Sequence, residues 1–313
     1  MYYIIKKIGI GIVLVFTVSI LVFSILYMMP GTPIEIMADN KVSEQKQAEM
    51  VKAYGYDQPL HIQYIRWMKR IVIDHDFGDS IRYKVPVSDL LKKRIPRSVA
   101  LCGCSLAIEM LVSIPLGLLC AVKKGKPIDR LTIGTSAIVA SIPNYLLCAV
   151  LILVFSVLLK WFPISGFGGP QYFVLPIFAL TAGTVSDSVR VARSEVLSML
   201  NEKYVTTALA KGLPYEKVLT RHVLRNSLIM ITVSVFMSLP WLVAGSVVVE
   251  KSFGIPGIGD LLLTSIEIQD FPVVQAVLLI IATLTVVCNI FSDIVVAILD
   301  PRIRISIDEG GRQ

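Results

Sequence analysis

Six apolar stretches, each long enough to cross a lipid bilayer as an α-helix, constrain this chain more than any other feature of its sequence. A membrane-spanning helix needs about 20 predominantly apolar residues. Charged residues make up only 17% of the 313 residues, against about 25% in a soluble domain. We therefore expect an all-α integral membrane protein of six transmembrane helices, over the ranges Ile8–Met29, Ser98–Val122, Leu131–Leu159, Tyr172–Val191, Ser227–Val249 and Val273–Leu299.

The first and third stretches each need a comment. The first follows Lys6 and Lys7, as a signal peptide would, but its apolar run is too long and Met28-Met29-Pro30 is no small-residue cleavage site. It is therefore expected to remain as a helix. The third stretch contains Pro143, and a proline inside a helix removes a backbone donor and clashes with the preceding turn. It is expected to tilt or kink there.

The basic residues predict the orientation of these helices. Lysine and arginine in short loops favour the cytoplasmic side. With the N-terminus inside, the two short outer loops carry only Lys160 and Lys251. Both termini are thus expected to be cytoplasmic, and the net charge of +7 reflects topology and membrane lipid rather than nucleic acid. The inner segments carry Lys6, Lys7, Lys123, Lys124, Lys126, Arg130, Arg190, Arg193, Lys203, Lys211, Lys217, Arg221, Arg225, Arg302, Arg304 and Arg312.

The cytoplasmic segment from Arg193 to Arg225 is polar but periodic. Apolar residues recur at helical spacing on both sides of Gly212. Gly212 is expected to end the first short helix, and Pro214 suits the first turn of a second one. Ala208 and Gly212, four residues apart, are expected to leave one face open to close approach by another protein.

This segment resembles a known family. The run YVTTALAKGL, residues 204–213, resembles the cytoplasmic loop of ABC importer permeases, and most closely that of the dipeptide/oligopeptide/nickel family. The resemblance implies that this loop docks on an ATPase subunit and transmits nucleotide-driven closure to the pore. Two residues depart from the family pattern: Leu209 stands where arginine is usual, and Met230 where proline is common. The implied coupling residues are Tyr204, Thr207, Ala208, Lys211 and Gly212.

Further motifs in the same order along the chain are similar to that family. They are Met29–Pro33, Tyr54–Leu60, Asp76–Ser80, Phe253–Gly259 and Asp300–Arg304. The implied organisation is an N-terminal transmembrane helix at residues 1–29 and an extracytoplasmic domain at 30–97. A type I ABC importer transmembrane domain follows at 98–301, with its coupling loop at 194–226, and a cytoplasmic tail at 302–313.

The resemblance also implies a function and partners. The chain would be the first of two permease subunits of an ATP-driven importer in the bacterial cytoplasmic membrane. It would work with a homologous second permease, two ATPase subunits and an extracytoplasmic binding protein. No GxxxxGK[ST] sequence occurs in the chain, so no cofactor is expected on it, and ATP and Mg²⁺ would be bound by the partner ATPases. It would not itself be an enzyme. Di- or oligopeptides are the expected substrates, and nickel or another metal chelate is the alternative.

The turn between the fifth and sixth stretches has two possible roles. Its tight glycine- and proline-containing sequence suits a gate or receptor contact at the outer mouth. It equally suits a re-entrant loop that packs against its own bundle. The residues concerned are Phe253, Gly254, Pro256, Gly257 and Gly259.

Three acids lie in or beside the apolar stretches, where a charge is costly and a function is suspected. Asp187 is expected to pair with Arg190, and Asp293 to form a cap or an ion pair. Glu109 is the deepest. It could line the translocation path, contact a substrate amine or pair with the second permease, and these alternatives stay open. We expect from the sequence that Glu109→Gln changes transport or assembly.

Other features favour ordinary structural roles. The residues Asp74, His75 and Asp76 could suggest a metal site, but the family turn explains them better. The five cysteines lie in apolar runs without a CxxC pair and are expected to be buried small hydrophobes. A secondary transporter would show inverted repeats and broken helices around midplane charges, and a membrane hydrolase would show a catalytic motif. Neither pattern is clear in this sequence.

Overall fold

The computed structural model describes residues 2–28 and 57–299, and within them every regular element is helical. The motifs at Met29–Pro33 and Asp300–Arg304, the residues Tyr54–Tyr56, most of the predicted extracytoplasmic domain and the predicted tail lie outside this part. The helices are α1 (Tyr2–Met28), α4 (Leu60–Val72), α5 (Val87–Val122), α6 (Pro127–Ala140), α7 (Asn144–Leu151), η1 (Ile152–Leu158), α8 (Gln171–Leu200), α9 (Lys203–Ala210), α10 (Tyr215–Val218), η2 (Leu219–Leu224), α11 (Arg225–Met237), α12 (Leu239–Phe253), α13 (Ile258–Glu267) and α14 (Phe271–Leu299).

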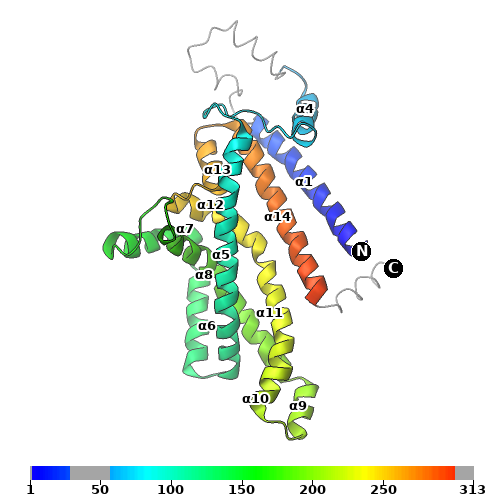
Figure 1. The fold of residues 1–313 in the computed structure, drawn as a ribbon, viewed down its shortest axis with the longest axis vertical. Helices are drawn as coiled ribbons and strands as arrows, with labels where there is room; N and C mark the ends of the chain where they lie inside the picture. The colour runs from blue at the N-terminus through cyan, green and yellow to red at the C-terminus, as the bar shows by residue number, and fades with distance from the viewer. Residues whose placement is uncertain (1, 29–56, 300–313) are drawn as a thin grey trace.

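These helices provide up to six membrane spans. Four are single helices long and apolar enough to cross a bilayer: α1, α5, α8 and α14. Two more are bent pairs, α6 with α7–η1 and α10–α11 with α12. The prediction of an all-α protein with six apolar spans is therefore confirmed when each bent pair counts as one span. Figure 1 shows α5, α8, α11 and α14 as the long axis of the bundle.

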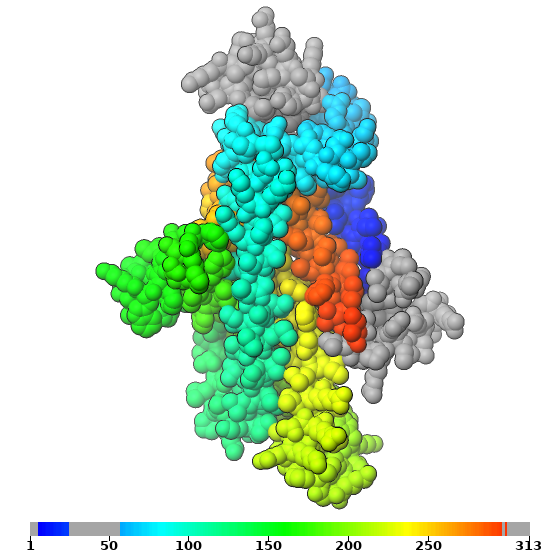
Figure 2. All heavy atoms as spheres, viewed as in Figure 1, coloured from blue at the N-terminus to red at the C-terminus, as the bar shows by residue number. Residues whose placement is uncertain are grey.

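The third apolar stretch turns through a sharp corner. The axes of α6 and α7–η1 differ by 104°, so the break is much sharper than the expected tilt or kink. Pro143 precedes α7 with φ −58° and ψ 138°, and a residue before proline is itself driven away from the helical region. As a result α7 and η1 project sideways from the bundle (Figures 1 and 2, green).

The second stretch lies in a longer helix than the apolar run indicates. Helix α5 begins at Val87, so the boundary predicted between residues 97 and 98 falls inside a helix. Val87 and Leu91 at the N-terminal end of α5 are buried against α13 and α14. Packing with these neighbours, rather than hydropathy, extends the helix. Pro96 and Pro115 lie within it, as spans allow where neighbouring groups satisfy the freed backbone.

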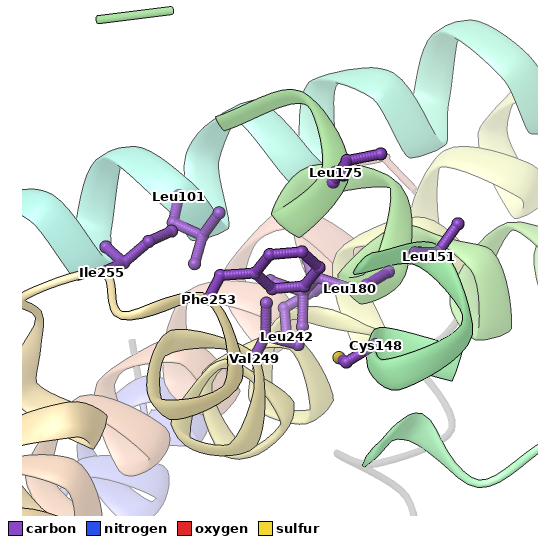
Figure 3. Packing of buried hydrophobic residues seen from close by; sticks show 10 residues of the cluster. Leu101, Cys148, Leu151, Leu175, Leu180, Leu242, Val249, Phe253 and Ile255 are labelled. Carbon is purple, nitrogen blue, oxygen red and sulfur yellow. The ribbon is translucent and has the colours of Figure 1, made fainter. Parts of the chain in front are cut away.

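The buried core forms three clusters along the bundle. The middle one is centred on Phe253 and joins residues of α5, α7, α8 and α12 (Figure 3). A second cluster, at the Val87 end of α5, joins α5, α13 and α14. A third, at the opposite end, joins α5 and α8 to the segment α9–α11. The segment α9–α10 and the turn between α12 and α13 are thus attached to the bundle by apolar packing.

The first and last helices lie side by side and antiparallel (Figure 1). Lys7 Nζ of α1 lies 2.9 Å from Asp293 Oδ2 of α14, which confirms the ion pair expected for Asp293. The Tyr2 end of α1 and the Leu299 end of α14 therefore share one side of the bundle. Helix α4 covers the other end of α1, where the Tyr64 hydroxyl lies 2.7 Å from Ser19 Oγ.

Candidate functional site

The segment after α8 folds as a short helix, a glycine corner and a second helix, as predicted. Helix α9 ends at Ala210, Gly212 has φ +78°, and α10 begins at Tyr215 after Pro214. A positive φ is readily adopted by glycine, and no atom lies within 4 Å of an added Cβ at Gly212. Figure 2 shows this segment protruding beyond the rest of the bundle at its lower end (yellow-green).

The apolar side of this segment faces its own bundle. Val205 and Ala208 are buried in the third cluster, so Ala208 does not leave the open face that the sequence suggested. The reason is the helical period of α9, which brings both residues to the side packed on α8 and α11. The residues left exposed include Tyr204, Thr207, Leu209, Lys211, Gly212 and Tyr215. Of the predicted coupling residues, Tyr204, Thr207, Lys211 and Gly212 are available to a partner.

The outer turn begins where α12 ends. Gly254 ends α12 in the left-handed conformation, with φ +63°, and α13 starts at Ile258. The first backbone N–H groups of a helix lack partners within it. Here Ile258 N–H donates to Ser98 Oγ at 2.8 Å, and Gly259 N–H donates to Glu250 Oε2 at 2.7 Å. The start of α13 is therefore capped by side chains of α5 and α12.

Two glycines of this turn are required by close approach. A Cβ on Gly257 would lie 2.3 Å from Glu250 Oε2, and a Cβ on Gly259 would lie 2.3 Å from the Cα of Val247. Phe253 is only 3% exposed and stands at the centre of the middle cluster (Figure 3). The motif thus folds into its own bundle, which supports the second of the two roles suggested by the sequence. Pro256 is half-buried, and its carbonyl accepts from Arg97 at 3.1 Å.

Two buried acids at this outer end were not singled out from the sequence. Glu250 is fully buried as the cap of α13. Asp270 is also fully buried and accepts hydrogen bonds from the N–H groups of Ile81 and Arg82, at 3.1 and 3.2 Å, and from the Ser80 hydroxyl. Glu250 directly follows the fifth apolar stretch, so the rule that ionisable groups in spans are significant could have found it.

A buried ion pair fixes the opposite end of the bundle. Arg193 of α8 donates to both carboxylate oxygens of Asp129 at the start of α6, at 2.6 and 2.9 Å. Gly125 N–H adds a third hydrogen bond of 2.8 Å to the same carboxylate. This bidentate geometry holds the α5–α6 turn against α8 close to the coupling segment.

A cavity of about 670 Å³ lies between the α6–α7 corner, α8 and the α11–α12 bend. Its wall is apolar for the most part, with Trp241, Met237 and Leu180 among the larger side chains. Polar groups also line it, namely Asn144, Thr184, Asp187, Ser188, Ser234 and Ser238. Asp187 is paired with Arg190 one turn away, as predicted. The cavity therefore offers hydroxyl and amide groups and one paired carboxylate to a molecule inside it.

Glu109 lies behind the wall of this cavity and does not line it. Its carboxyl group is fully buried between α5, α8 and the α11–α12 bend. Ser188 Oγ donates to its Oε1 at 2.6 Å, and Ser238 Oγ lies 2.8 Å from its Oε2. Glu109 therefore does not line this cavity directly, and its place on the translocation path stays a prediction. The hydroxyl partners of Glu109 are Ser188, Ser238 and, on α8, Thr184, all of its own chain, and all three line the cavity.

The acidic turn before α5 is built as the family motif indicated. Asp76 accepts a hydrogen bond from Gly78 N–H at 2.7 Å and forms an ion pair with Arg70. These donors, Arg70 first, hold the pKa of Asp76 below its ordinary value. No group of three possible metal ligands occurs in residues 2–28 and 57–299.

The five cysteines are all free thiols. Cys102, Cys120 and Cys148 are buried, and Cys288 is half-buried. Cys104 is exposed, so the expectation of burial inside the chain is wrong for that residue.

The sequence matches two family models over most of its length. Residues 113–305 match the binding-protein-dependent transport system inner membrane component, and residues 1–102 match the N-terminal model of the same system. The chain belongs to this family. It is a multi-pass bacterial inner membrane protein and a pore-forming permease of an ABC importer.

Relatives and a solved structure agree with this family. The chain is 37% identical over 312 residues to the oligopeptide transport system permease protein AppB of Bacillus subtilis (strain 168), which covers 96% of this chain and 98% of that protein. It is 33% identical over 302 residues to the glutathione transport system permease protein GsiC of Escherichia coli (strain K12), with 96% and 98% covered. An inward-facing MetNI methionine ABC transporter chain matches with a TM-score of 0.56 and 20% identity, over 67% of this chain and 96% of that chain, and this likeness supports the fold alone.

Proposed function

We propose that this permease carries di- or oligopeptides. The observation that carries the proposal is the 37% identity, over 96% of the chain, to a permease named for oligopeptide transport. The glutathione permeases add a second group of relatives with a small peptide substrate. The relatives do not favour the nickel or metal-chelate alternative.

The composition of the cavity supports a peptide substrate. Serine, threonine and asparagine side chains can donate to and accept from peptide groups, and they alternate in the wall with apolar surface around Trp241. A wall of this kind can contact the backbone and the apolar side chains of a peptide without requiring one particular peptide sequence. Only one carboxylate, that of Asp187, lines the cavity, and Arg190 already neutralises it.

We further propose that the exposed side of α9 receives the motion of an ATPase subunit. Tyr204, Thr207 and Lys211 face outward, while Val205 and Ala208 fasten the helix to the bundle. A push on α9 would thus pass through the third cluster into α8 and α11, which carry the cavity wall. ATP and Mg²⁺ would be bound by two partner ATPases, and a second permease and a binding protein would complete the importer.

This proposal sets the orientation of the chain. In Figure 1 the Tyr2 end of α1 and the Leu299 end of α14 are the ends of these helices that point toward the side of the bundle from which α9 protrudes, although α9 lies further out. If α9 meets an ATPase, both termini are cytoplasmic, in agreement with the distribution of lysine and arginine. Accessibility of single cysteines introduced on α9 and at the outer turn tests this directly.

The deciding experiment is ATPase activity of the complex, co-expressed with its genomic neighbours and reconstituted in lipid with the binding protein. We expect stimulation by di- or oligopeptides and none by nickel chelates. Gly212→Pro should abolish stimulation, because proline requires φ near −65° and Gly212 has +78°. Gly212→Asn is the matched control, since asparagine tolerates a positive φ, and should retain it.

Three outcomes would contradict the proposals separately. Stimulation by chelates alone would keep the importer and overturn the peptide substrate. Full stimulation in Gly212→Pro would overturn coupling through α9. A purified complex without any ATPase subunit would overturn the dependence on ATP.

A further inference from the structure

Glu109 joins three helices at the back of the cavity wall. It lies in the middle of α5 and is fully buried. Its two carboxyl oxygens lie 2.6 Å from Ser188 Oγ on α8 and 2.8 Å from Ser238 Oγ at the α11–α12 bend. Both serines line the cavity, so the position of Glu109 bears on the shape of its wall.

If Glu109 is ionised, the Ser238 hydroxyl has one proton for two neighbouring acceptor oxygens. Ser238 Oγ lies 2.8 Å from Glu109 Oε2 and also 2.7 Å from the carbonyl oxygen of Val235. A serine hydroxyl has one proton to donate, whereas a carboxylate and a carbonyl are acceptors only. If Glu109 were ionised, the single Ser238 proton would have to be shared between these two acceptors.

A proton on Glu109 Oε2 satisfies every contact. The carboxylic acid donates to Ser238 Oγ, the Ser238 hydroxyl donates to the Val235 carbonyl, and the Ser188 hydroxyl donates to Glu109 Oε1. A hydroxyl can donate once and accept twice, so this arrangement is chemically complete. The protonated form gives each of the three contacts a proton of its own.

The surroundings of Glu109 supply no cation to hold a charged form. None of the ion pairs within residues 2–28 and 57–299 includes it. Residues 105–113 of α5 contain no other ionisable side chain, and residues 231–245 across the α11–α12 bend contain none. On α8 the nearest ionisable residues along the chain are Asp187 and Arg190, which pair with each other.

Five other acids on helices that pack against α5 have partners elsewhere: Asp129 with Arg193, Asp260 with Arg94, Glu267 with Lys251, Asp293 with Lys7, and Glu250 with the backbone N–H of Gly259. Glu195, also on α8, lies seven residues beyond Ser188 along the chain.

We infer that Glu109 is a neutral, proton-carrying acid that acts as a positioning residue for Ser188 and Ser238. It fixes two hydroxyls of the cavity wall on different helices and places no negative charge behind them. This inference concerns the permease itself and does not depend on which substrate crosses the cavity.

The inference changes the expected behaviour of variants. In Glu109→Gln the amide nitrogen can donate to Ser238 while the amide oxygen accepts from Ser188, so the uncharged network is preserved. We therefore expect close to wild-type uptake, contrary to the expectation from sequence alone. Glu109→Asp keeps the acid but is one methylene shorter and cannot reach both serines. Its uptake should fall by about tenfold, as for one lost hydrogen bond.

Infrared difference spectroscopy of the complex in lipid tests the proton directly. Near neutral pH, the wild-type spectrum minus that of Glu109→Gln should contain the C=O stretching band of a protonated carboxyl group, sensitive to deuterium exchange. Asp187→Asn is the matched control. Asp187 lies beside Ser188 but is exposed and paired with Arg190, so that variant should change only carboxylate bands. Carboxylate bands alone in the Glu109→Gln difference would overturn the inference.

A second variant keeps the test decisive if Glu109→Gln does not assemble. Ser188→Ala removes the donor to the C=O oxygen of Glu109, and loss of that hydrogen bond should move the protonated-carboxyl band to higher frequency. An unchanged band would overturn the assignment to Glu109. A residue that only fills space would give neither the protonated-carboxyl band nor this pattern of uptake. The proposed role predicts both the band and uptake that is retained in Glu109→Gln but reduced in Glu109→Asp.

Discussion

Replacing Gly259 by alanine would place a methyl group inside the backbone of α12. The added Cβ would lie 2.3 Å from the Cα of Val247 and 3.1 Å from Glu250 Oε2. Carbon atoms pack at about 3.5–4.0 Å, so α13 would have to move by more than about 1 Å. Because the clash is with backbone, no side-chain rotation can relieve it.

The cost of this change has two parts. Overpacking a well-packed site costs about 1–3 kcal/mol. Moving α13 also breaks the 2.7 Å hydrogen bond from Gly259 N–H to Glu250, and a buried group left without its partner costs a further 1–3 kcal/mol or so. We expect Gly259→Ala to lower the free energy of unfolding by about 2–6 kcal/mol, on the upper side of single substitutions.

Thermal unfolding of the lipid-reconstituted complex measures this effect. Using the dependence for soluble domains of 150–250 residues, the Tm should fall by about 4–24 °C. Gly103→Ala in α5 is the control, because its Cβ would meet no atom within 4 Å and alanine favours a helix. A Gly259→Ala protein as stable as the control would refute the close approach of α12 and α13.

Three further predictions concern buried and exposed carboxylates. Arg193→Ala leaves Asp129 buried without its bidentate partner, and chemical unfolding should show a fall of about 3–5 kcal/mol in the free energy of unfolding. Adding Asp129→Ala to the same chain should restore part of this loss. Asp270→Ala leaves two backbone N–H groups without their acceptor, so limited proteolysis before α5 should become faster; an unchanged rate would contradict that anchoring role. Because the pKa of Asp76 is lowered, its ion pair with Arg70 stabilises the turn at pH values above the ordinary aspartate pKa. This stabilisation is lost as the pH falls through the lowered pKa. Asp76→Asn should therefore slightly raise the rate of amide hydrogen exchange in this turn near neutral pH and leave it unchanged in acid. The corresponding loss in the free energy of local opening is less than about 1 kcal/mol, because the ion pair is exposed.

Features that depend on neighbours in the sequence could be predicted. The apolar stretches identified the spans because crossing a bilayer requires a fixed length of apolar helix. The corner at Pro143 and the glycine corner at Gly212 follow from the allowed backbone angles of those residues. The pair of Asp187 with Arg190 follows from helical spacing.

Features that depend on which helices meet were decided only by the tertiary structure. Periodicity identified the apolar side of α9 but not that Ala208 would face the bundle instead of a partner. Glu109 was recognised as unusual, yet Ser188 lies 79 residues and Ser238 129 residues away in the chain. Glu250 was missed because its partners are backbone groups at the start of α13, which no side-chain pattern reveals.

The division has a physical reason. Hydropathy, proline and glycine act within one or two helical turns, where covalent geometry fixes the distances. The sequence alone therefore determined that six spans exist, that the third breaks at Pro143 and that the coupling segment turns at Gly212, but not the bend between α11 and α12. The hydrogen bonds of a buried carboxyl group depend on which side chains a particular helix crossing brings within about 3 Å. Only the packed bundle decided that Glu250 caps α13 and that Glu109 stands behind the cavity wall rather than within it.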